Sequence, residues 1–175
     1  MKTWGSETLT ASDMTTYLTN NIEYLKAATD GLAFSGVEAS RLSNQSISNA
    51  TATNVSFTSE GFDYGGYFGG SGTAITVPAA AIPSGYTTIA LDVNARARFA
   101  SNATGYRRLK VYVNGSATSS ISVDANAGAE TEVTVSDVVI AASGAVITLE
   151  AYQTSTGALN LETCTLHVIR RAPVA

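Results

Sequence analysis

The first part of the chain repeats apolar side chains along one helical face. They stand at Met14, Leu18, Ile22 and Leu25, in steps of four, four and three residues. Thr10 and Asp13 have the spacing of a capping box just before this stripe, and Gly31 stands where a helix-ending glycine is expected. The pattern predicts an amphipathic helix over residues 11–30.

The sequence leaves open what covers the apolar stripe of this helix. The stripe can pack on the domain that follows, on copies of itself, or on another protein. Leu18, Ile22 and Leu25 match a d-a-d heptad fragment, but the adjacent a positions hold Thr15 and Thr29. Three positions do not define a coiled coil, so we expect the stripe to pack on a neighbouring surface.

Residues 35–54 are rich in Ser, Asn, Ala and Thr. Such side chains bury little apolar area and compete with the backbone for its hydrogen bonds. We therefore expect a linker here, extended along another surface.

From about residue 55 onward, apolar and polar positions alternate with period two. The alternation predicts strands at Asn54–Ser59, Thr73–Val77, Tyr86–Asn94, Ala97–Ala100, Tyr106–Val113, Thr118–Val123, Glu130–Val135, Val138–Ile140, Val146–Tyr152 and Leu159–Ile169. Asn114-Gly115 between two of these runs indicates a two-residue hairpin turn, because both central residues must accept positive φ.

About ten short strands with no helical pattern between them predict an antiparallel β-sandwich or jelly roll. The expected fold is therefore mainly β. It has an N-terminal segment at 1–34 that contains the helix, an extended linker at 35–54, and a jelly-roll domain at 55–175.

Composition narrows the function classes. Only 14% of the 175 residues are charged and 45% are hydrophobic, which is too apolar and too weakly charged for a disordered chain. No apolar run reaches the ~18 residues of a membrane span, and a net charge of −4 argues against a nucleic-acid binder. We expect no nucleic-acid and no membrane partner. The basic run Arg107–Lys110 is expected to face solvent or to form salt bridges.

Reactive side chains are scarce. The single histidine, His167, alternates with core-type residues in a strand, and the single cysteine, Cys164, falls on the opposite face of that strand. One Cys cannot form an internal disulfide or, with one His, a Cys-rich zinc site. Asp124–Glu130 resembles the start of a calcium loop, but its twelfth position is Val135. We therefore expect no catalytic, cofactor-binding or metal-binding residues. The first residues also lack the apolar region of a signal peptide, so we expect an intracellular product.

The glycine-rich segment Gly61–Gly72 has the look of a phosphate-binding loop, but a strand rather than a helix is predicted after it. Its aromatic residues favour a flexible loop that either forms a subunit contact or is displayed outward: Phe62, Tyr64, Tyr67 and Phe68.

Several segments, taken in order, resemble a family of tailed-bacteriophage virion proteins. They are Glu60–Asp63, Ile75–Pro78, Gly85-Tyr86, Arg98–Arg108 and Val113–Gly115, preceded by Trp4, Glu7–Met14, Asn20–Ile22 and Leu25-Lys26. The C-terminal module resembles the trimeric jelly roll of the complement and tumour-necrosis-factor superfamily. One departure is Ala79–Ser84, which is longer than the tight turn expected there.

The resemblance implies a non-enzymatic homotrimer in the virion, assembled in the host cytoplasm and attached to phage capsid or tail proteins by its N-terminal segment. The attachment face would comprise Trp4, Met14, Leu18, Ile22 and Leu25. Two roles stay open. One is a capsid decoration or head-fibre protein, and the other is a short tail fibre or tip that binds a host receptor or surface glycan through its jelly-roll loops.

Overall fold

A computed structural model describes residues 10–32 and 34–174 of the chain, with the backbone but not the side chains of Asp13 and of residues 23–32. The chain divides into two compact units, Met1–Ala33 and Phe34–Ala175. Trp4, expected on the attachment face, lies outside the described residues, as does the side chain of Leu25.

The N-terminal unit contains α1, which runs from Ala11 to Leu32. Its first turn begins where the sequence predicts, since the Met14 N–H donates to the Thr10 carbonyl at 3.1 Å. The expected stop at Gly31 is wrong, because this glycine lies inside the helix. Met14, Leu18 and Ile22 are each more than half exposed.

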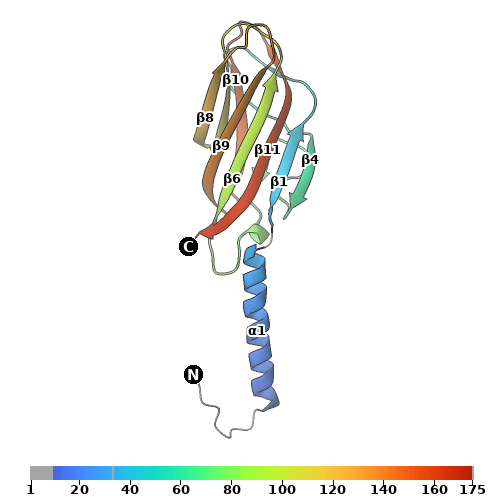
Figure 1. Cartoon of the computed structure of the whole chain (residues 1–175), viewed down its shortest axis with the longest axis vertical. Helices are drawn as coiled ribbons and strands as arrows, with labels where there is room; N and C mark the ends of the chain where they lie inside the picture. The colour runs from blue at the N-terminus through green and yellow to red at the C-terminus, as the bar shows by residue number, and fades with distance from the viewer. Residues whose placement is uncertain (1–9, 33, 175) are drawn as a thin grey trace. The chain divides into compact units, whose positions relative to one another are not determined.

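The second unit is a sandwich of two antiparallel sheets (Figure 1). Sheet A has the strand order β4 (Ser59–Tyr64), β1 (Gly36–Arg41), β11 (Leu159–Val174), β6 (Thr88–Phe99) and β9 (Thr131–Ala142), with β2 (Gln45–Ile47) also paired to β11. Sheet B has the order β3 (Thr53–Asn54), β10 (Val146–Gln153), β7 (Tyr106–Val113) and β8 (Ser116–Asp124), with β5 (Ala74–Thr76) also paired to β10. Neighbouring strands are mostly distant in sequence, as in a jelly roll, so the predicted fold class is confirmed.

Alternating side chains from the inner faces of both sheets form one core. Its fully buried members include Phe57, Phe99, Leu109, Leu149 and Leu166. The hairpin between β7 and β8 turns at Asn114 and Gly115 with φ of 50° and 76°, as the sequence predicts. Two pairs of predicted strands are single long strands, β6 and β9.

The predicted linker at residues 35–54 is wrong. This stretch supplies β1, β2 and β3, and β1 lies inside sheet A between β4 and β11. Only Val37 and Ala39 are fully buried apolar residues of β1, so its burial comes from strand partners far away in sequence rather than from its composition. The jelly-roll unit therefore begins near Phe34. The long connection at Ala79–Ser84 holds a short 3-10 helix, Ala79–Ala81.

Candidate assembly face

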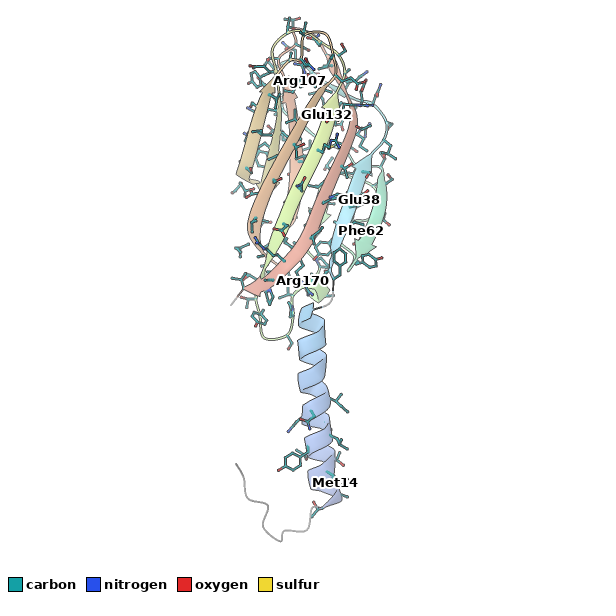
Figure 2. All side chains as sticks on the ribbon, viewed as in Figure 1. Met14, Glu38, Phe62, Arg107, Glu132 and Arg170 are labelled. Atoms are coloured by element: carbon teal, nitrogen blue, oxygen red, sulfur yellow. The ribbon has the colours of Figure 1, made fainter. Side chains whose placement is uncertain are left out.

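The outer face of sheet A presents two cross-strand rows that span five strands. The first row is Tyr64, Gly36, Ile169, Asp92 and Val138, and the second is Phe62, Glu38, His167, Asn94 and Ser136. At about 4.8 Å per strand each row crosses roughly 19 Å. We call the surface formed by these rows and by the residues directly beside them the assembly face. Figure 2 labels Phe62 on β4 and Glu38 on the neighbouring strand β1.

One edge of the assembly face carries an aromatic cluster. Phe34 lies 5.7 Å from Phe62 and 5.5 Å from Tyr64 between ring centroids, and Phe62 stacks on Tyr64 at 5.8 Å. Phe34 is 56% and Tyr64 60% exposed. Monomeric proteins rarely leave contiguous rings this open without a binding role.

His167 joins the aromatic cluster to the polar centre of the face. Its ring lies 6.4 Å from that of Phe62, and its Nε2 is 3.0 Å from the Glu38 Oε2. Gly61 leaves room for the glutamate, since a Cβ at this position would lie 2.6 Å from the Glu38 Oε1. His167 faces outward as predicted. Cys164 points into the core, and burial raises the pKa of its thiol to about 12.

The centre of the face is polar, and its charges are balanced by pairs within the chain. Arg96 Nη2 donates to both carboxylate oxygens of Glu132 at 2.7 Å, and Asn94 donates to the Ser136 Oγ at 3.0 Å. These side chains are exposed, so each pair adds little to stability. Their value here is that a partner covering the face meets few unpaired charges.

The far edge of the face is apolar again. Val138 and Ile140 on β9 are both more than half exposed, while Val139 between them is buried. The assembly face thus has an aromatic edge, a charge-balanced centre and an aliphatic edge. The two apolar edges offer exposed apolar area that a partner could bury, and the charge pairs of the centre leave few unpaired charges for that partner to cover.

The sequence placed Phe62 and Tyr64 in a contact or display loop, and the structure places both on the assembly face, in strand β4. The same expectation is wrong for Tyr67 and Phe68, which are 2% and 8% exposed and belong to the core. Aromatic type alone does not distinguish a displayed ring from a buried one.

The segment after β4 turns inward through specific hydrogen bonds. Asp63 Oδ1 accepts the N–H groups of Gly66 and Tyr67 at 3.1 and 2.9 Å, and Oδ2 accepts that of Phe68 at 3.0 Å. The Tyr67 hydroxyl lies 2.9 Å from the Ser35 Oγ, and burial raises the pKa of Tyr67. This segment is a packed turn rather than a flexible loop.

Sequence reasoning missed Phe34, Val138 and Ile140. A signal for the last two exists, because the run from Val138 to Ala141 is apolar at successive positions. In a strand this puts apolar side chains on both faces. Phe34 gives no such signal, because its ring partners come from β4.

The basic run behaves differently from the prediction at one position. Arg107 is 0% exposed and donates to the backbone carbonyls of Thr104 at 3.0 Å, Tyr106 at 3.2 Å and Asn102 at 3.3 Å. Burial lowers the pKa of its guanidinium. Figure 2 shows Arg107 near the end of the jelly roll opposite to Arg170.

Arg108 follows the prediction, because its Nη2 lies 3.1 Å from the Glu150 Oε1 on the outer face of sheet B. Within residues 10–32 and 34–174, no cluster of three or more His, Cys, Asp or Glu side chains is arranged to hold a metal ion. In the same described residues, no helix combines the length and apolarity needed to cross a membrane.

Comparison with known proteins shows the fold. No protein-family model matches the sequence, and no curated protein matches it significantly. Among solved structures, murine APRIL at pH 8.0 aligns with a TM-score of 0.58 and 14% identity over 79% of this chain and 100% of its own. Murine APRIL at pH 5.0 aligns with a TM-score of 0.57 and 12% identity over 79% of this chain and 100% of its own. The PRD1 vertex protein P5 aligns with a TM-score of 0.51 and 13% identity over 80% of this chain and 73% of its own. The jelly roll is similar to those of a tumour-necrosis-factor-like protein and a viral vertex protein.

Proposed function

We propose that this chain is a non-enzymatic structural protein of a phage virion that assembles as a homotrimer through the assembly face. The observation that carries the proposal is the exposed aromatic edge of sheet A, Phe34 and Tyr64, opposite the exposed aliphatic edge, Val138 and Ile140. In a closed ring of three copies the interface is heterologous, so the aromatic edge of each copy can meet the aliphatic edge of the next. This interface also covers the open strand edges at β4 and β9, which otherwise invite aggregation.

The virion role rests on the sequence resemblance, and a solved structure has a compatible fold. The order of the segments from Glu60–Asp63 to Val113–Gly115 resembles tailed-phage virion proteins, and a vertex protein of phage PRD1 has a similar fold. A likeness at 13% identity concerns the fold alone, so the role itself rests on the sequence resemblance. In this proposal the chain is a capsid decoration or head-fibre protein, and its N-terminal segment attaches it to the particle.

An alternative role is that of a short tail fibre or tip that binds a host receptor or glycan. One observation favours it. On the outer face of sheet B, Tyr106 stacks on Tyr152 at 5.7 Å, and the Arg108 guanidinium lies 4.4 Å from the Tyr152 ring centroid. Such rings, with polar groups beside them, offer an apolar surface together with hydrogen-bonding partners for a sugar.

The test is particle assembly with a chain that lacks residues 1–32, so that the jelly roll is left intact. We expect the shortened protein to remain a folded trimer and to be absent from purified virions, whereas the full chain is present. Shortened protein found in virions at full copy number contradicts the attachment role. Density or antibody label on the tail tip, rather than on the capsid, supports the alternative role.

A further inference from the structure

The apolar stripe of α1 is exposed and long enough for the helix to pack against copies of itself. Leu18 and Ile22 are more than half exposed on a helix of 22 residues, which is about 33 Å long at 1.5 Å per residue. An amphipathic helix obtains most of its stability from packing its apolar face. The face of α1 therefore needs a partner.

The observed length of α1 completes a heptad pattern. With Ile22 at position a, the d positions are Leu18, Leu25 and Leu32, each seven residues from the last. Leu32 lies inside the helix, two residues beyond the end that the sequence predicts. The a/d pattern thus extends over three consecutive d positions, which is the spacing of a coiled-coil seam.

Two of the three a positions of α1 hold threonine, Thr15 and Thr29, and the hydroxyl of Thr15 does not oppose such a seam. Thr15 occupies the a position before Ile22, and its hydroxyl donates to the Ala11 carbonyl at 2.8 Å within the same helix. A buried hydroxyl is costly mainly when it lacks a hydrogen-bond partner. Thr15 can therefore enter an apolar seam with its hydrogen bond already made.

The flanks of the seam are nearly uncharged. The g positions hold Met14, Asn21 and Ala28, and the e positions within the helix hold Ser12, Thr19 and Lys26. Lys26 is the single charge among them, while Asp13, Glu23 and Asp30 fall at f or b, away from the seam. Met14 and Ala28 at g widen the stripe beyond strict a and d, as in the core-facing helices of a bundle.

We propose that the α1 helices of three copies form a parallel, in-register coiled coil. This inference rests on the proposed trimer and names the partner of the stripe. A single residue, Ala33, separates Leu32 from the jelly-roll unit that begins at Phe34. A trimeric jelly roll therefore holds three helices at a high effective concentration, which offsets the marginal stability of a short helix. Attachment to the particle then falls to Trp4 and its neighbours and to the outer surface of the coiled coil.

The test uses full-length protein with a single cysteine introduced in α1. Leu18→Cys lies at d, and the matched control Asn20→Cys lies at f on the same exposed helix. The native Cys164 is 1% exposed in the core, so we expect it not to react with the maleimide. Each variant is treated with a short bis-maleimide at low micromolar and tenfold lower concentration, and the molar mass is measured by sedimentation on the same samples.

We expect Leu18→Cys to link chains in pairs at least about tenfold faster than Asn20→Cys, at a rate that does not change on dilution. Leu25→Cys, the next d position, repeats the result if Leu18→Cys disturbs the helix. A trimer in which the d and f variants react equally, or in which neither reacts, overturns the coiled coil and leaves the proposed function standing. A monomer in both samples overturns the proposed trimer itself.

Discussion

Replacing Tyr64 with alanine should weaken the trimer far more than it weakens the folded protomer. The side chain is 60% exposed, and a fully buried tyrosine removes about 200 Å² from water. Trimer formation therefore covers roughly 120 Å² more at this residue, which is worth about 3 kcal/mol per copy at ~25 cal/mol/Å². Three copies lose about 9 kcal/mol per trimer, or about a million-fold in the association constant.

The constant for a trimer depends on the square of the protein concentration, so the midpoint of dissociation should rise about a thousand-fold. A dilution series followed by sedimentation velocity measures this midpoint, and circular dichroism checks that the protomer stays folded. The matched control is Tyr112→Ala, a tyrosine on the outward side of β7 in sheet B, which should leave the midpoint unchanged. A shift of less than tenfold for Tyr64→Ala, or an equal shift for Tyr112→Ala, would refute the assignment of the assembly face.

Three further predictions concern the stability of the folded protomer. Asp63→Ala removes the acceptor of three backbone N–H groups and should lower the free energy of unfolding by about 2–3 kcal/mol, measured by urea denaturation; no loss would mean that the turn does not depend on this carboxylate. Gly105→Ala brings a Cβ into the Thr154 backbone carbonyl at a φ of 71° and should lower the free energy of unfolding by at least about 3 kcal/mol. Gly144→Ala is the control, because Gly144 also has positive φ but lies in open space, and it should cost about 1–2 kcal/mol. Equal costs in urea denaturation would contradict the steric cause. Burial raises the pKa of Cys164 to about 12, so above pH ~9 the unfolded thiol ionises while the folded one does not, and the free energy of unfolding should fall with pH by up to about 1.4 kcal/mol per unit. Cys164→Ala should remove that part of the slope in urea titrations between pH 8 and 11, and an unchanged slope would contradict it.

Local pattern was sufficient for β7 and for the turn that follows it. The β7 strand matches its predicted range because Leu109 and Val111 alternate with outward polar residues. The turn at Asn114-Gly115 was predictable because its backbone conformation demands these residue types. These signals lie within a few neighbouring residues.

The pattern failed where partners distant in the sequence decide the structure. The β1 strand reads as a polar linker, yet it pairs with β4 and β11 and lies inside sheet A. The polar composition of β1 gives no signal of these partners. Arg107 is a different case, because its acceptors are the backbone carbonyls of residues one to five positions earlier, and backbone carbonyls are present whatever the local sequence.

The assembly face could be predicted only in part for the same reason. Phe62 and Tyr64 stood out as aromatic residues in a glycine-rich segment, but their neighbour Phe34 and the opposite edge at Val138 are brought onto one face by strand register. The inward position of Tyr67 depends on the turn that Asp63 holds. Composition alone cannot separate these cases.

Sedimentation equilibrium of the full chain at micromolar concentration tests the central claim most directly. A homotrimer assembled through sheet A should give a single species with three times the protomer mass of 18.0 kDa, and it should dissociate when Tyr64 is replaced. A single species of 18.0 kDa at the same concentration would contradict the trimer and with it the role assigned to the assembly face.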